Sequence, residues 1–424
     1  ALVRTTLHGP LNPSTASEDS VIPTAPTDRL HGLDALRGFA LLLGIALHAC
    51  MSYLPGAETF WIVAEDQPSL ALAGFFFWVH SFRMGLFFLL AGYFGRLLLQ
   101  RRGFSGFVRD RLRRILLPLL AFWFPLLVAV IAVVVWAAWL KHGGELPEQE
   151  QPPLSADNFP LMHLWFLYLL CLFYPALLML RALLAWIDHG GRVQAALDAL
   201  MRAVLGPRAA LILALPVAGA LAMHPGWWAW FGIPTPDQSL YPSSAALLCY
   251  GLAFTVGWAM QRQPPLLHAL ARRWPLNLAL ALIGHIACIA LIGLQSSAEA
   301  AEHGAPQTWL YAYAYGLCGW GWTLALLGLA LRYLERAHPA SRYLAESSYF
   351  LYLAHLPVVM AAQVVASRVQ APWWVEYPVA LALSLAVLLA TYQLGVRHTA
   401  LGRWLNGGSP RRAQPPVAAS ETSP

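Results

Sequence analysis

Residues 33–54 of the chain read LDALRGFALLLGIALHACMSYL. This stretch is almost wholly apolar, although it carries Asp34 and Arg37 near its beginning and His48 towards its end. About 20 consecutive, mainly apolar residues are enough for a helix to cross the hydrocarbon core of a bilayer. The stretch therefore predicts a membrane-spanning helix, over residues 35–54, that carries ionisable groups into the bilayer.

The composition of the whole chain also points to the bilayer. Of its 424 residues, 58% are hydrophobic and 11% are charged, whereas soluble domains have roughly 45–50% apolar and about 25% charged residues. The formal net charge of +6 could indicate nucleic-acid binding, but the arginines lie in short loops between apolar segments. Arginines in such loops orient a membrane protein, so we expect no nucleic-acid partner.

We expect an all-α fold, a polytopic membrane bundle of about ten transmembrane helices. Each segment is long and apolar enough to span a bilayer, and the fifth is the shortest. The expected helices cover residues 35–54, 72–95, 115–139, 160–180, 209–223, 243–261, 275–294, 308–331, 347–366 and 375–396.

The charges between these segments predict their orientation. If residue 1 is cytoplasmic, all but four of the 27 Lys and Arg residues fall in inner loops or tails. Lys141 and Arg368 fall outside, and Arg37 and Arg83 fall within helices. The positive-inside rule therefore supports the number of helices and predicts that both termini are cytoplasmic, in a multi-pass protein of the bacterial inner membrane.

We expect one transmembrane domain over residues 31–400, between disordered cytoplasmic tails at 1–30 and 401–424. The first tail has no hydrophobic h-region, so the first spanning helix is expected to direct insertion. The cysteines all lie inside apolar segments without metal-ligand spacing, which favours inert packing over disulfides. They are Cys50, Cys171, Cys249, Cys288 and Cys318.

Ionisable side chains at membrane depth usually mark function, because they are costly to bury there. Arg37 and His48 are eleven residues apart, which puts them within ~20° on one helix face and ~16 Å apart along the axis. Asp34 precedes Arg37 by one turn and lies within reach of its guanidinium. The plainer interpretation is that Arg37 extends to lipid headgroups and that His48 is a packing residue.

Four more ionisable groups lie in the outer half of the membrane or near its middle. His80 and Arg83 share one helix face, His163 begins the fourth helix beside Trp165, and His355 precedes the kinking Pro357. In structural roles, Arg83 would pair with a neighbouring helix and His163 would be interfacial. A neutral imidazole that accepts a proton, beside a guanidinium that binds an anion, suits acyl transfer to a hydroxyl. Proton-coupled transport would use the same groups.

The segment from Arg96 to Arg114 contains seven arginines. The positive-inside rule explains most of them, and the surplus would attract a polyphosphorylated cofactor from the cytosol. We find no Walker A loop, dinucleotide fingerprint, zinc-protease motif or nucleophile elbow, so we expect neither ATP hydrolysis nor a catalytic metal. The candidate cofactor contacts in this segment are Arg109, Arg111, Arg113 and Arg114.

Four stretches, in order, resemble the membrane acyltransferase 3 superfamily, and the resemblance extends from about residue 30 to 400. Two sequence details depart from the pattern of relatives, because Ala91 replaces a frequent Ser and Leu356 replaces the second of two paired histidines. The role of His355 is therefore open. The matching stretches are Leu33–Gly38 with His48, His80–Phe88 with Ala91–Phe94, His163–Leu167, and Leu351–Pro357.

The resemblance is strongest to the branch that succinylates osmoregulated periplasmic glucans. It implies O-acyl transfer from a cytosolic acyl-CoA, succinyl-CoA or acetyl-CoA, to a carbohydrate hydroxyl outside, with no bound cofactor. His48 would be the general base, and Arg37, oriented by Asp34, would hold the cofactor side. Arg83 would stabilise the oxyanion or bind the free carboxylate of a succinyl donor. The expected contacts to the substrate are His80, His163, Trp165 and His355.

Two other functions stay open at this point. One is O-acetylation of lipopolysaccharide or an exopolysaccharide, within the same superfamily. The other is a carrier or flippase without chemistry, which matching broken helices in two halves of the chain would favour. We see no such pair of broken helices. Turnover of acyl-CoA by the purified protein would separate the enzyme from the carrier.

Overall fold

The computed structural model of the chain describes residues 31–65, 67–145, 153–295, 305–334, 336 and 338–406. Within these ranges the chain is helical and has no strand, which agrees with the all-α prediction. The tail at 1–30 and most of the tail at 401–424 lie outside the described residues. Residues 401–406 belong to a short helix, so the folded part extends beyond the expected end at residue 400.

Twelve α-helices follow one another along the described chain, joined in places by short 3₁₀ or π segments. The 3₁₀ turns cover Met51–Tyr53, Ala57–Thr59, Met162–Leu164 and Ala229–Phe231, and the π segments cover Leu112–Leu116 and Tyr392–Val396. The helices are α1 (His31–Cys50), α2 (Leu70–Arg111), α3 (Leu117–Lys141), α4 (Trp165–Ile187), α5 (Arg192–Val204), α6 (Ala209–Ala222), α7 (Ser244–Met260), α8 (Pro264–Ile292), α9 (Pro306–Tyr333), α10 (Pro339–Ala366), α11 (Trp373–Thr391) and α12 (Ala400–Asn406).

Seven helical runs in the described residues are long and apolar enough to cross a membrane, as expected of a multi-pass membrane protein. One of them, Leu70–Lys141, has 72 residues and contains two of the expected spans. The pair α5 and α6, bent by 104°, would add an eighth, and α7 is a shorter apolar helix. The number ten and the orientation of the termini therefore stay predictions.

The arginine-rich segment after residue 95 is helical, although the end of the apolar run predicted a loop. Arginine is a good helix former, so a change of polarity ends the apolar run without ending the helix. The break comes at Gly103, whose φ of 67° and ψ of −176° interrupt α2. This conformation favours glycine, and it folds the last turns of α2 back towards the bundle.

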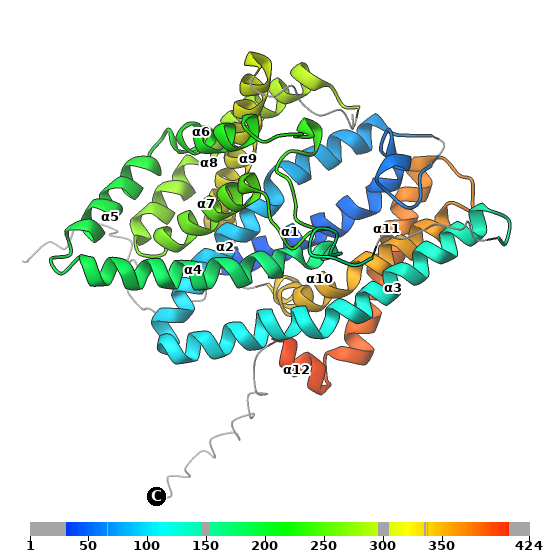
Figure 1. Cartoon of the computed structure of the whole chain (residues 1–424), viewed down its shortest axis with the longest axis horizontal. Coiled ribbons are helices and arrows are strands. Elements are labelled where there is room, and N and C mark those ends of the chain that lie inside the picture. Colours follow the sequence, from blue (N-terminus) through cyan, green and yellow to red (C-terminus); the bar gives the residue numbers. More distant parts are fainter. Residues whose placement is uncertain are drawn as a thin grey trace, which may run out of the picture.

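The bundle has two groups of helices with α1 and α2 between them. Figure 1 shows α6, α7, α8 and α9 on one side and α3, α10 and α11 on the other. Glycines allow the closest approach, because a Cβ on Gly92 of α2 would lie 2.0 Å from the Phe254 carbonyl oxygen of α7. A Cβ on Gly257 of α7 would lie 1.9 Å from the Leu89 oxygen of α2. Small residues of this kind let membrane helices pack backbone to backbone.

Candidate functional site

A cavity of about 2550 Å³ lies between α1, α2, α4 and α10. The α1 residues that line it range from His31, in the first turn, to His48, in the last. At 1.5 Å per residue, the cavity therefore follows α1 for about 25 Å. A cavity of this length can receive two substrates from opposite ends.

Most of the residues that the sequence singled out line this one cavity. Two of the four candidate arginines do not, since Arg109 and Arg113 are exposed and absent from its walls. The residues that line it are Asp34, Arg37, His48, His80, Arg83, Arg111, Arg114, His163, Trp165 and His355.

Three histidines from distant segments meet in the cavity beside the last turn of α1. The imidazole centroid of His355 lies 5.1 Å from that of His48 and 4.9 Å from that of His163. His355 comes from α10 and His163 from the short turn before α4. The Met162 backbone next to His163 has a φ of 51°, and its N–H donates to the Asp237 carbonyl oxygen at 2.8 Å. Such strained backbone is held only where the surroundings enforce it, and here it presents His163 to the cavity.

Backbone carbonyls set the proton positions of the neutral rings, because a carbonyl can only accept a hydrogen bond. His355 Nδ1 donates to the Tyr352 oxygen at 2.7 Å, and His163 Nε2 donates to the Leu353 oxygen at 3.0 Å. His80 Nε2 donates to the Phe231 oxygen at 2.8 Å. When such a ring is neutral, its remaining nitrogen is an acceptor. Among the described residues, the buried Nδ1 of His48 has no hydrogen-bond partner.

The guanidinium of Arg83 lies over α1 at a glycine. A Cβ on Gly44 would lie 2.2 Å from Nη1 of Arg83, so the side chain occupies the space that glycine leaves. Gly44 precedes His48 by one helical turn, which places the guanidinium beside the histidines. In the described part of the chain, the buried Nε of Arg83 has no hydrogen-bond partner. The arrangement puts an anion-binding group and proton acceptors on one stretch of cavity wall.

Near the beginning of α1, Arg37 makes the contact that its spacing predicts. Its Nη2 lies 3.7 Å from the Asp34 carboxylate and donates to the Ala345 carbonyl oxygen at 3.3 Å. The guanidinium is thus fixed between α1 and α10. This interaction confirms the expected ion pair.

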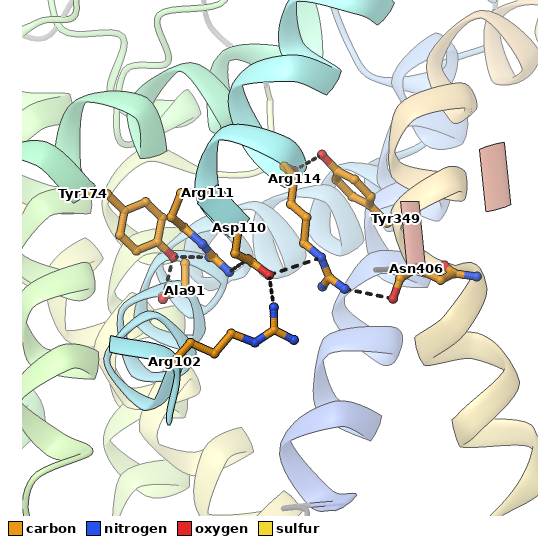
Figure 2. Close-up of polar contacts among 8 residues, drawn as sticks. All are labelled: Ala91, Arg102, Asp110, Arg111, Arg114, Tyr174, Tyr349 and Asn406. Atoms are coloured by element: carbon orange, nitrogen blue, oxygen red, sulfur yellow. Dashed lines mark hydrogen bonds and ion pairs between the residues drawn. The ribbon is translucent and has the colours of Figure 1, made fainter. Parts of the chain in front are cut away.

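Asp110 organises the arginines at the same end of the cavity, as Figure 2 shows. Its carboxylate lies 2.6 Å from Arg111, 3.1 Å from Arg102 and 3.7 Å from Arg114. Arg111 also donates to the Tyr174 hydroxyl at 3.0 Å, so its guanidinium is held on two sides. Arg102, with 54% of its side chain exposed, keeps donors available to a ligand. Arg102 is one of the seven arginines counted in this segment, but it was not among the four candidate contacts, and Asp110 was not singled out at all.

The end of the cavity near His48 is aromatic. Trp61 has its ring centroid 6.1 Å from that of His48, and Phe60 packs on Phe231 with centroids 5.1 Å apart. Trp228 contacts Phe231 in turn, and all four line the cavity. In the same lining, burial raises the pKa of Asp237, against the opposing effect of a hydrogen bond from Thr235.

All five cysteines are free thiols, and four of them are buried. Among the described residues, no three His, Cys, Asp or Glu side chains are arranged to hold a metal ion.

Comparison with known proteins gives the family. Residues 30–393 match the acyltransferase 3 family, described as an acyltransferase domain. Glucans biosynthesis protein C from Escherichia coli strain SMS-3-5 is 32% identical over 152 residues, and its namesake from E. coli O1:K1 is equally similar. The matched stretch covers 34% of this chain and 37% of each relative. No solved structure matches the chain. The chain therefore belongs to the acyltransferase 3 family.

Proposed function

We propose that this protein transfers an acyl group, with succinyl preferred, from cytosolic acyl-CoA to a hydroxyl of a periplasmic glucan across the bacterial inner membrane. The observation that carries the proposal is the single cavity along α1, with arginines at one end, aromatic rings at the other and histidines between. The partial match to glucans biosynthesis protein C supports the choice of acceptor.

The donor would bind at the arginine end. Coenzyme A carries phosphates that cannot cross a bilayer, so its nucleotide has to stay at the cytosolic face while the acyl thioester reaches inward. Arg37, Arg102 and Arg114 line that end, and guanidinium groups bind phosphates with charge-assisted hydrogen bonds. Arg111, committed to Asp110 and Tyr174, would act as part of the frame.

The glucan hydroxyl would meet the thioester beside His48. The hydroxyl oxygen attacks the thioester carbonyl while the His48 imidazole takes the hydroxyl proton. Collapse of the tetrahedral intermediate forms the ester, and the departing thiolate recovers the proton as free thiol. Positioned proton transfer of this kind contributes typically ~10²–10⁴-fold to the rate.

Arg83 would stabilise negative charge beside His48. Its guanidinium lies over Gly44, one turn from His48. It could stabilise the oxyanion of the intermediate or hold the free carboxylate of a succinyl donor in a fork. His355, whose Nε2 makes no backbone contact within the described residues, would bind a substrate hydroxyl, and His163 would pack beside it.

The test is acyl transfer by the purified protein in nanodiscs, with succinyl-CoA or acetyl-CoA as donor and a glucan as acceptor. Mass spectrometry of the glucan measures the ester. We expect succinylation by the wild type and a loss of about 10²–10⁴-fold in His48→Ala. His189→Ala is the matched control, since His189 is exposed and outside the cavity. Near wild-type transfer by His48→Ala would show that His48 is not the general base.

A further inference from the structure

Gln363 links the end of α1 to the loop that follows it. Its side chain, in α10, is fully buried. The amide Nε2 donates to the carbonyl oxygens of His48 at 2.9 Å and Ala49 at 3.1 Å. Its Oε1 accepts a hydrogen bond from the indole Nε1 of Trp61 at 3.0 Å. The orientation of the amide is unambiguous, because carbonyls only accept and an indole N–H only donates.

These hydrogen bonds fix two things at once. The last carbonyls of a helix have no hydrogen-bond partner within the helix. The Gln363 amide donates to two such carbonyls, at the turn of α1 that carries His48. It also holds the Trp61 indole through its Nε1. The Trp61 ring lines the cavity with its plane 21° from that of the His48 imidazole. Gln363 therefore ties the indole to the turn of α1 that carries His48.

The chemistry of a tryptophan at this place favours a sugar ring. The face of an indole is electron-rich, and it attracts the weakly positive C–H groups that line one face of a pyranose. A pyranose stacked on Trp61 would lie in the part of the cavity that holds the imidazole, whose centroid is 6.1 Å from that of the indole. A tryptophan that anchors a protein at the membrane interface would instead turn its indole N–H to headgroups and water. The Trp61 N–H donates to the buried side-chain amide of Gln363.

We propose that Trp61, held by Gln363, is the subsite on which one pyranose ring of the acceptor stacks, so that a ring hydroxyl lies at His48. This inference rests on the proposed function, because it assigns the acceptor end of the same cavity. Trp61 binds the sugar, and Gln363 is a positioning residue for Trp61 and for the turn of α1 that carries His48.

The test compares Trp61→Ala, Trp61→Phe and Gln363→Leu with Trp374→Ala. Trp374, at the beginning of α11, is 60% exposed and does not line the cavity, so it is a matched control. We expect Trp61→Ala to raise the KM for the glucan about tenfold, as loss of an aromatic contact would. The KM for acyl-CoA should stay unchanged. Trp61→Phe keeps an aromatic face and should lose less.

Gln363→Leu separates positioning from simple packing. We expect it to raise the glucan KM and also to lower kcat, because both the indole and the His48 turn lose their partner. Unfolding temperature and elution profile in detergent show whether each variant is folded. An unchanged glucan KM in folded Trp61→Ala overturns the inference, as does an equal rise in both KM values.

Direct binding keeps this inference separate from the proposed function. Calorimetric titration of the protein with a glucan oligosaccharide needs no turnover. Weaker binding in Trp61→Ala than in Trp374→Ala supports the subsite, even if the wild type transfers no acyl group. Equal binding in both variants overturns the subsite, even if the wild type is an active succinyltransferase.

Discussion

At the scale of single residues, Gly44 matters for the space that it leaves. A Cβ there would overlap Nη1 of Arg83, whereas a Cβ on Gly219 of α6 would meet nothing within 4 Å. We expect Gly44→Ala to displace the guanidinium and to reduce acyl transfer towards the level of an Arg83 variant. Gly219→Ala should leave transfer unchanged. Steady-state rates of the two variants test this, and full activity in Gly44→Ala would contradict the described position of Arg83.

A lysine substitution at Arg83 distinguishes the two roles proposed for this residue, which are binding the donor carboxylate and stabilising the oxyanion. Lysine keeps the charge but loses the planar fork that grips a carboxylate. If Arg83 holds the distal carboxylate of a succinyl donor, Arg83→Lys should reduce transfer from succinyl-CoA about tenfold more than transfer from acetyl-CoA, since a charge-assisted hydrogen bond contributes roughly 1.5–3 kcal/mol. Parallel rate measurements with both donors decide. Equal losses with both donors would mean that Arg83 stabilises the oxyanion and does not bind the succinyl carboxylate.

Helical periodicity was enough to predict part of the site. It put Arg37 and His48 on one face, and both line the cavity. Gln363 and Trp61 could not be found that way, because their importance lies in contacts between segments about 300 residues apart in the chain. A single glutamine near the end of an apolar helix has no pattern of its own.

At the scale of elements, Asp110 holds the folded-back end of α2. Removing its carboxylate leaves three guanidinium groups without their shared partner. We expect Asp110→Ala to lower the free energy of unfolding by about 1–3 kcal/mol, allowing for the exposure of Arg102. The KM for acyl-CoA should rise while the KM for the glucan does not change.

The matched control is Arg342→Ala, which removes an exposed ion pair with Glu346 on one helix. Such pairs contribute little, so the change should stay within about 0.5 kcal/mol. Thermal unfolding in detergent measures both variants. Equal, small effects would mean that Asp110 does not organise the arginines.

Hydropathy alone does not show which residues of the arginine-rich segment face the bundle. Residues 109 and 113 are four apart and share the exposed face, while Asp110, Arg111 and Arg114 share the face towards the bundle. Helical spacing would have separated these faces, but the segment was expected to be a loop. The kink at Gly103 and the partner Tyr174 depend on packing and were not predictable.

At the scale of the whole molecule, orientation is a prediction that labelling can test. Arg109 and Lys141 are both exposed and lie on opposite sides of the predicted topology. A membrane-impermeant thiol reagent added to intact spheroplasts should modify Lys141→Cys and spare Arg109→Cys until the cells are opened. The native cysteines are buried or half-buried and give a low background. The reverse pattern would invert the topology.

The meeting of His48, His163 and His355 is likewise a property of the whole bundle. Sequence patterns placed each histidine at membrane depth, but three segments have to pack together before the rings come within about 5 Å. The family resemblance gave their order along the chain and not their distances. The cavity joins them to the arginines because α1 lines it from its first turn to its last.

The most direct test of the central claim is sided acyl transfer in proteoliposomes of uniform orientation. Labelled succinyl-CoA is supplied only on the side of Arg102, and the glucan only on the side of Trp61. We expect the label to reach the glucan with both substrates kept apart, and we expect His48→Ala to prevent this. Transfer only when both substrates share one side, or equal transfer by His48→Ala, would contradict it.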